Sequence, residues 1–409
     1  MQQACRPLDV REQERDRATR KVSHARDDCA ERSPRLRPAD RHAFRPRARG
    51  TGSGCHTERH RSRTCLASGY DAVLVLKTSW GTGPRRSAAD TNWTRSLDRL
   101  SDVRMTQVAT ALQIPLRGPK GEPVDLVRTF TSHGVADLRP GQVDEEERAY
   151  TTTLALPRAQ PRTIRISAGR RGFARVEVQG RKLGQQAERD LTAAVRQILN
   201  LDEDLSEFYA LVSDDPDLSW AAAGSGRMLR TPTVFEAAVK TICTTNVAWS
   251  ATVRMVNALV ENLGEPAASG ARAFPTAEAM AAVPESFYRE TVRAGYRSAY
   301  LHALASGVVT GVFEVEELGA QTDLPDDEVA SKLLALPGIG PYGAAHLMML
   351  LGRHSRLILD SWTRPQYAKV NGRKASDATV ERRFRRYGRY SGLAFWLYLT
   401  RDWVPDEPR

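Results

Sequence analysis

The sequence predicts an α+β protein in which a small antiparallel-sheet domain precedes an all-α domain, with a disordered basic tail at the N-terminus. Short β-prone stretches follow one another between residues 150 and 180, whereas the spacing of apolar residues beyond residue 230 is helical. The first 104 residues show neither pattern. We therefore expect a tail over 1–104, a sheet domain over 105–215 and a helical domain over 225–409.

The positive charge of the chain is concentrated in the tail. The net charge is +11, and residues 1–104 alone hold 23 Lys and Arg against 13 Asp and Glu. This Arg-rich segment cannot bury enough apolar surface to offset its chain entropy. It is expected to be a solvated leader or sequence translated upstream of a start at Met105, with a basic nucleic-acid-binding arm as the alternative. The charge therefore does not indicate that the folded part binds DNA.

Cysteines and hydropathy exclude several classes of protein. Four cysteines lie in the tail at irregular spacing, which fits neither a zinc site nor a disulfide framework. The fifth, Cys243, is expected in an apolar helix face as a core residue. No apolar run of about 18 residues and no signal-peptide core occurs, so we expect a cytoplasmic protein without membrane partners.

The expected elements follow from local patterns. YTTTLALP (150–157), RTIRISAG (162–169) and FARVEVQG (173–180) predict antiparallel strands, and a helix is expected over 185–199. Thr233, followed by Glu236, has the spacing of a capping box at the start of the helical domain. Further helices are expected at 248–263, 295–308, 326–336, 341–352, 362–370, 377–388 and 391–403.

The stretch LPGIGPYGAAHL, starting at Leu336, predicts two helices joined by a tight hairpin. Pro337 ends the first helix, Gly338 and Gly340 allow positive φ and close backbone approach, and Pro341 suits the first turn of the second helix. Free N–H groups at such a helix N-terminus attract phosphate without any basic side chain.

This hairpin, followed about twenty residues later by LILDSW (357–362), resembles the helix-hairpin-helix and Gly/Pro/Asp signature of the base-excision DNA glycosylases, over roughly residues 115–403. ICTTNVAWSATVRMV (242–256) and AGYRSAYL (294–301) are similar to segments of the 8-oxoguanine branch, and FTSHGVADLRP (130–140) to the sheet domain of that branch and of the 3-methyladenine branch. The resemblance implies the following DNA contacts: Asn246 in the gap left by the everted base, Tyr296 and Arg297 at its former partner, and Gly338, Ile339, Gly340 and Tyr342 at the hairpin. Gly134 is interpreted as a turn glycine.

The resemblance also implies that Asp360 is the catalytic residue. Cleavage of an N-glycosidic bond leaves positive charge on the sugar, which a fixed carboxylate stabilises while it orients or deprotonates water. The residues alone equally allow Asp360 to cap the helix that begins near Trp362 and Thr363.

Two departures from the family predict a glycosylase without lyase activity and without an iron-sulfur cluster. Tyr342 stands where bifunctional members carry a lysine that attacks the sugar, and Lys332 is expected to be a solvated helix residue. Tyr342 either lines the base pocket or packs in the core. No cysteine follows Cys243, so no cluster and no required cofactor are expected. The resemblance implies a monovalent cation, Na or K, at the carbonyls of Leu334, Leu336 and Ile339.

The C-terminal segment supplies the remaining candidates. After Asp360 the chain holds 11 Lys and Arg against 5 acids, and this concentration indicates either phosphate contacts or a solvated face. The arginines concerned are Arg382, Arg383, Arg385 and Arg386. Phe395, Trp396 and Tyr398 are candidates to stack on an everted base, with the core as their alternative location.

We therefore expect a monomeric, monofunctional DNA glycosylase that acts on damaged double-stranded DNA. Ala251 stands where an arginine is expected in 8-oxoguanine enzymes, and Phe395 where those enzymes carry a glutamine, so an alkylated purine is favoured over 8-oxoguanine. The alternative is a non-catalytic helix-hairpin-helix module that binds DNA.

Overall fold

The structure, a computed structural model, describes residues 108–319 and 322–404. The predicted disordered tail lies outside the described residues. Those that are described belong to a single unit, Leu66–Arg409. No helix in this part of the chain is both long and apolar enough to span a membrane.

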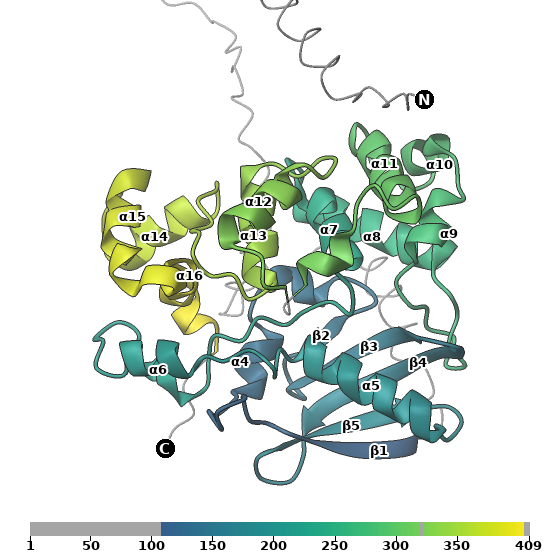
Figure 1. The fold of residues 1–409 in the computed structure, drawn as a ribbon, viewed down its shortest axis with the longest axis horizontal. Helices are drawn as coiled ribbons and strands as arrows, with labels where there is room; N and C mark the ends of the chain where they lie inside the picture. Colours follow the sequence, from purple (N-terminus) through teal and green to yellow (C-terminus); the bar gives the residue numbers. More distant parts are fainter. Residues whose placement is uncertain (1–107, 320–321, 405–409) are drawn as a thin grey trace, which may run out of the picture. The chain divides into compact units, whose positions relative to one another are not determined.

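A five-stranded antiparallel sheet, in the order β1-β5-β4-β3-β2, forms the first half of the fold (Figure 1). Its strands are β1 (Val108–Pro115), β2 (Gln142–Asp144), β3 (Ala149–Leu156), β4 (Ala159–Ala168) and β5 (Phe173–Gln179). The three predicted strands are confirmed as β3, β4 and β5, whereas β1 and the short β2 were not predicted. In β5, Ala174, Val176 and Val178 alternate with more exposed neighbours and are buried, as a strand with one face on the core requires. The predicted helix α5 (Gln185–Ile198) covers the sheet and buries Leu191 and Val195.

The remaining elements are mainly helical, and every predicted helix is present with small shifts of its ends. Two short elements interrupt the sheet region, α4 (Leu126–Phe130) and η1 (Gly134–Asp137). The others are α6 (Ser206–Val212), η2 (Ser219–Ala223), α7 (Val234–Thr244), α8 (Trp249–Leu263), α9 (Ala277–Ala281), α10 (Glu285–Glu290), α11 (Arg297–Val309), η3 (Val315–Leu318), α12 (Asp326–Leu334), α13 (Pro341–Leu350), α14 (Thr363–Asn371), α15 (Asp377–Phe384), η4 (Arg385–Tyr390), α16 (Ser391–Thr400) and η5 (Arg401–Trp403).

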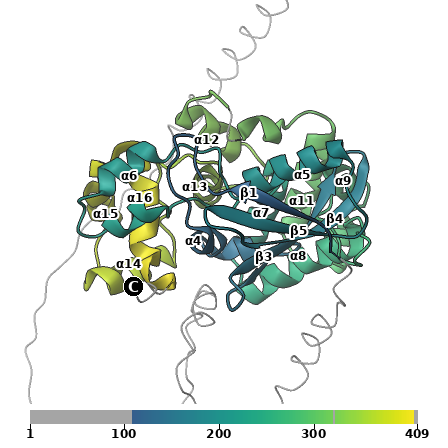
Figure 2. The same cartoon turned by 90° about the horizontal axis from the view of Figure 1, so that it is seen from below.

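Helix α6 packs with the C-terminal helices, although the sequence assigns residues 105–215 to the sheet domain. The ring of Phe208 lies 5.3 Å from that of Tyr390, and Glu207 forms an ion pair with Arg389. Figure 1 and Figure 2 both show α6 beside α16. Leu201 is buried in the core around the sheet, as is Leu229 further along the chain, whereas Leu205 and Phe208 are buried in the helical core.

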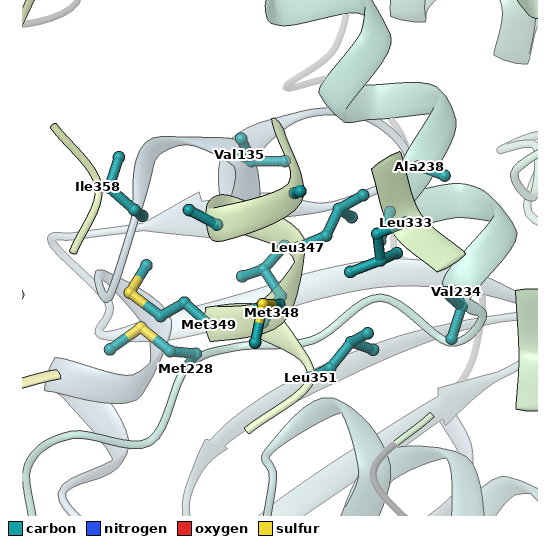
Figure 3. Packing of buried hydrophobic residues seen from close by; sticks show 14 of the residues in the cluster. Val135, Met228, Val234, Ala238, Leu333, Leu347, Met348, Met349, Leu351 and Ile358 are labelled. Carbon is teal, nitrogen blue, oxygen red and sulfur yellow. The ribbon is translucent and has the colours of Figure 1, made fainter. Parts of the chain in front are cut away.

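Helix α13 lies at the centre of the helical core. All its side chains from Gly343 to Leu350 are buried, which explains why it is apolar on every face. Figure 3 shows Leu347, Met348 and Met349 among side chains from other elements, including Val135 and Ile358. Because α13 is packed on all sides, the hairpin at its N-terminus is held in a fixed place.

The N-terminus of α7 is capped differently from the prediction. Thr233 Oγ1 accepts the N–H of Glu236 at 3.1 Å, as expected. The second bond of a capping box, from the N–H of Thr233 to the Glu236 side chain, is not formed between these described residues, so that half of the prediction is wrong. Glu236 instead forms a buried ion pair with Lys240 at 2.7 Å. The carboxylate of Glu316 in η3 adds a second cap from another segment, because it accepts the N–H groups of Val234 and Phe235, each at 2.9 Å.

A fully buried arginine joins the sheet region to the helical region. Arg227 Nη2 donates to Glu122 at 3.0 Å, and Nη1 donates to the carbonyls of Asn200 at 2.6 Å and Glu203 at 2.7 Å. The contacts connect the loop before α4, the segment after α5 and the segment that leads to α7. Buried charges are tolerated when they are paired and hydrogen-bonded in this way.

Replacing Arg227 should destabilise the fold strongly. In Arg227→Met, Glu122 stays buried without its cationic partner, and we expect the free energy of unfolding to fall by about 3–5 kcal/mol, measured by urea denaturation. Arg289→Met, which breaks the exposed pair with Glu285, is the matched control and should cost no more than about 1 kcal/mol. Equal losses in the two variants would contradict a structural role for the buried pair.

Candidate active site

The hairpin between α12 and α13 depends on one glycine. Gly338 has φ of 76°, and a Cβ atom there would lie 2.7 Å from the side chain of Tyr300. Both the backbone angle and the close contact therefore exclude a larger residue. Gly340 does not have the predicted positive φ, since its φ is −97°. A Cβ atom at Gly340 would meet no other atom within 4 Å, so the space in front of it is open to an approaching backbone.

The three residues predicted to hold a cation lie in this turn. Leu336 and Ile339 are buried, and the Leu336 carbonyl accepts the N–H of Ile339 at 3.2 Å. Leu334 is exposed at the end of α12. Among the described residues, no group of three His, Cys, Asp or Glu side chains is placed to bind a metal. The cation at the carbonyls stays a prediction.

Asp360 is fixed by the first turn of α14. Its Oδ1 accepts the N–H groups of Trp362 at 2.9 Å and Thr363 at 2.6 Å, and its own N–H donates to Thr363 Oγ1 at 2.8 Å. Asp360 thus caps the helix, as the alternative interpretation expected. Oδ2 has no hydrogen-bond partner within 108–319 and 322–404. Arg364, the nearest cation in sequence, is held by Asp377 through two 2.8 Å bonds.

The half-buried Asp360 lines a cavity of about 100 Å³. The other lining residues, none of them basic apart from histidine, are His133, Gly134, Val135, Thr244, Val247, Trp249, Thr252, Tyr342, His346, Ile358, Trp362, Trp396 and Trp403. Typical ligand pockets are about 300–1,000 Å³. This cavity therefore suits a single planar group.

Aromatic rings form most of the cavity wall. The ring of Trp362 lies 5.4 Å from that of Trp396 and 5.8 Å from that of Trp403, while Tyr342 stacks on His346 at 6.1 Å. Trp396 Nε1 donates to the Ser132 carbonyl at 2.8 Å. That bond fixes one wall, because a buried indole N–H needs a partner.

Two histidines approach each other on the cavity wall. The rings of His133 and His346 meet edge to face at 6.0 Å, and His133 Nε2 is 2.7 Å from the Leu229 carbonyl. Burial, with a further contribution from His133, lowers the pKa of His346 to about 3, so its imidazole is neutral. Nε2 of His346 and Nε1 of Trp362 are buried without a hydrogen-bond partner in the described part of the chain.

The aromatic residues predicted for the base pocket are separated by the structure. Tyr342 and Trp396 line the cavity, but Phe395 and Tyr398 do not. Their rings pack against Phe384 at 5.2 and 5.6 Å. Neighbours on a helix point about 100° apart, so Trp396 and Phe395 cannot both face the cavity. Phe395 and Tyr398 are therefore core residues.

The residues predicted to contact the DNA around the everted base lie near the α7–α8 loop. Asn246 is exposed, with φ of 45°, between two residues that line the cavity. Tyr296 is 54% exposed. Arg297 is only 5% exposed, and its guanidinium donates to the carbonyl of Thr245 and, at 3.2 Å, to Thr245 Oγ1. The prediction that Arg297 contacts DNA is therefore corrected, because its guanidinium is committed to supporting the loop.

The four candidate arginines of α15 and η4 divide into two pairs. Arg383 donates to Asp217 at 3.0 Å and Arg386 to Asp215 at 2.9 Å, so acids already neutralise both. Arg382 and Arg385 are exposed and have no acidic partner among the described residues. Arg382 also lines a groove of about 560 Å³ without acidic residues, formed by Tyr367, Asn371, Arg373, Lys374, Ala375, Ser376, Thr379, Arg382 and Arg383.

A larger cavity of about 1160 Å³ shares no lining residue with the one at Asp360. Its charged groups are mostly paired with each other. His354 Nε2 is 2.5 Å from Glu203. Burial alone would raise the pKa of Glu203, but His354, Arg230 and Arg227 lower it to about 2. This network supports the junction between α5 and the helical region.

Several cavity residues were not predicted from the sequence. His346 lies one helical turn after Tyr342, so the i, i+4 spacing places both on one face of α13. That spacing would have found it. Gly134, interpreted as a turn glycine, also lines the cavity together with His133. Trp249, Trp362 and Trp403 carry no local signal beyond being tryptophans.

No protein-family model and no curated protein matches this sequence. Solved structures do match it. A 3-methyladenine DNA-glycosylase from Archaeoglobus fulgidus is 18% identical, with a TM-score of 0.56 over 71% of this chain and 97% of that one. An MBOgg1 structure with a low-affinity DNA ligand is 18% identical, with a TM-score of 0.55 over 72% and 97% of the two chains.

An 8-oxoguanine glycosylase/lyase from Clostridium acetobutylicum is 20% identical, with a TM-score of 0.52 over 68% of this chain and 92% of that one. This chain has the fold of the helix-hairpin-helix DNA glycosylases. The glycosylase fold accounts for the order of the sheet, the hairpin and the C-terminal helices. At these identities the similarity establishes the fold alone.

The buried His346 should make the glycosylase fold less stable in acid. Its pKa is about 3 in the folded protein and about 6.5 in the unfolded chain. As pH falls through this window only the unfolded chain takes up the proton, so stability is lost. Between pH 7 and pH 5 the free energy of unfolding of the wild type should fall by about 2 kcal/mol more than that of His346→Phe, measured by urea denaturation. Equal losses in both proteins would contradict a buried neutral imidazole.

Proposed function

We propose that this protein is a monofunctional DNA glycosylase that removes a damaged purine, with alkylated purines favoured. The observation that carries the proposal is the position of Asp360. One carboxylate oxygen is fixed by two backbone N–H groups, and the other has no hydrogen-bond partner in the described residues. Asp360 itself lines the aromatic cavity. A fixed anion beside a slot for one flat ring is what base excision requires.

The chemistry follows from this geometry. A base everted from the duplex would stack between the aromatic walls. The bond between C1′ and the base nitrogen breaks, the electron pair leaves with the base, and positive charge develops on the sugar. Asp360 stabilises that charge and orients a water, whose oxygen bonds to C1′ while its proton passes to the Asp360 carboxylate and from there to solvent. The products are the free base and an abasic site.

The proposal of a monofunctional enzyme is supported by the residues around the cavity. Lysine and arginine are absent from its lining, and Tyr342 is where the resemblance would place a lysine nucleophile. Lys332 is exposed on α12 and is not among the lining residues. Water is therefore the proposed nucleophile.

The cavity wall supports an alkylated purine as the substrate. Electron-poor, positively charged rings are attracted to the faces of tryptophan and tyrosine, and Trp249, Tyr342, Trp362 and Trp396 are all available in the lining. 8-Oxoguanine is the second candidate, because Gly134 places backbone on the cavity surface. The structure of a glycosylase/lyase for that base is among the similar ones.

The proposed DNA partner is a duplex, bound by a monomer through two surfaces. Backbone N–H groups of Gly338 and Gly340 at the start of α13 suit a phosphate. Arg382 and Arg385 supply charge for a second backbone contact. Asn246 and Tyr296, exposed near the α7–α8 loop, are the proposed contacts to the gap and the partner strand.

Asp360→Asn should separate binding from catalysis. Asparagine also caps helices well, so we expect a stability change below about 1 kcal/mol and unchanged affinity for damaged duplex. Base release should fall at least about 100-fold. The measurements are thermal unfolding, fluorescence anisotropy with labelled duplex, and single-turnover release from duplexes carrying 3-methyladenine, 7-methylguanine, hypoxanthine or 8-oxoguanine.

Unchanged release by Asp360→Asn would move the catalytic role to another group. No release by the wild type from any of these duplexes would favour the non-catalytic DNA-binding module. A covalent adduct after borohydride reduction would show that an amine of the protein attacks C1′, which contradicts the monofunctional proposal.

Removing the unpaired arginines should lower the salt dependence of DNA binding. Each phosphate contact contributes about 0.9 to the slope of log K against log salt concentration. We expect the Arg382→Ala/Arg385→Ala double variant to lose up to about 2 from this slope. Arg386→Ala is the control on the same segment, and its effect should be smaller because Asp215 already neutralises this residue. Similar slopes for both variants would contradict the assignment.

A further inference from the structure

His346 is a buried polar group in the cavity wall to which no residue in 108–319 or 322–404 gives a hydrogen bond. It is 4% exposed, it lines the cavity with Asp360, and no described residue forms a hydrogen bond with its ring. An unpaired buried polar group is costly. Its ring is nevertheless held in place, stacked on Tyr342 at an interplanar angle of 17° and met edge-on by His133.

Three other polar side chains around the cavity already donate hydrogen bonds within the protein. Thr244 Oγ1 donates to the Thr241 carbonyl at 2.7 Å, and Thr252 Oγ1 donates to the Cys243 carbonyl at 2.9 Å. Trp396 Nε1 is bound to Ser132. Nε2 of His346, like Nε1 of Trp362, is therefore left without a hydrogen-bond partner among the described residues. His346 is the ring held between Tyr342 and His133, and a neutral imidazole keeps one N–H donor for a ligand.

Building on the proposed glycosylase activity, we propose that His346 donates a hydrogen bond to the everted base and so extends the substrate class to neutral damaged purines. When the bond to C1′ breaks, the electron pair moves onto the base. An alkylated base that is already cationic becomes neutral and leaves readily. A neutral purine becomes negatively charged, so a donor to one of its acceptor atoms, such as N7 or a 6-oxo group, stabilises its departure.

The test compares a neutral and a cationic base in the full-length protein. Single-turnover release is measured from duplexes that carry hypoxanthine or 7-methylguanine, for the wild type, His346→Phe and His346→Asn. Phenylalanine keeps an aromatic ring against Tyr342 but removes the donor, whereas asparagine restores an N–H group. Affinity for a duplex with an abasic-site analogue, which has no base to contact, monitors folding and DNA binding.

We expect the wild type to release both bases. His346→Phe should release hypoxanthine about 10- to 100-fold more slowly, with 7-methylguanine slowed less than about 3-fold and abasic-duplex affinity unchanged. His346→Asn should recover part of the hypoxanthine rate. If His346 had only a structural role, its replacement would slow the release of both bases alike, and that result would overturn the proposal.

Two further outcomes distinguish this proposal from the one on which it rests. Release of 7-methylguanine but not hypoxanthine by the wild type would overturn the role of His346 and leave the glycosylase activity standing. Release of neither base, together with none of 3-methyladenine or 8-oxoguanine, would overturn both. A hypoxanthine rate in His346→Phe equal to that of the wild type would overturn the donor role alone.

Discussion

The site depends on the hydrogen bonds that hold one carboxylate oxygen of Asp360 to the backbone of Trp362 and Thr363. An aspartate at the end of an apolar segment would otherwise turn toward water, because burying an unpaired charge is expensive. Two N–H groups at the start of α14 provide the partners that this oxygen needs. The helix cap and the proposed catalytic role are therefore compatible, because capping occupies Oδ1 and leaves Oδ2 of this cavity-lining residue for the substrate.

The cavity around this carboxylate is assembled from segments that are far apart in the chain. His133 and Gly134 come from the sheet region, α8 contributes Trp249, α13 contributes Tyr342, and α16 contributes Trp396. Their relative positions depend on buried polar contacts across the two regions, such as the bond from Trp396 to Ser132. Loss of such a contact should displace a wall even where no catalytic group is touched.

The sequence predicts the features that are local. Strands β3 to β5, the hairpin at Gly338 and the helix cap at Asp360 depend on residues close together in the chain, and the structure contains all of them. Strand β1 was missed because it pairs with β5, more than 50 residues away. The half-correct capping box at Thr233 shows the same limit, because Glu236 pairs with Lys240 and the distant Glu316 supplies the carboxylate that caps α7.

The other wrong predictions concern side chains whose contacts come from residues distant in the sequence. The sequence predicts DNA contacts for Arg297, Arg383 and Arg386, but each of these guanidinium groups donates a hydrogen bond to an oxygen of the protein. Phe395 and Trp396 are adjacent and equally apolar, and only packing decides which one reaches the cavity. His346 is the opposite case. It lies in an apolar helix and is buried, yet its Nε2 has no hydrogen-bond partner in the described part of the chain. Such a residue can be recognised only after its neighbours have been placed.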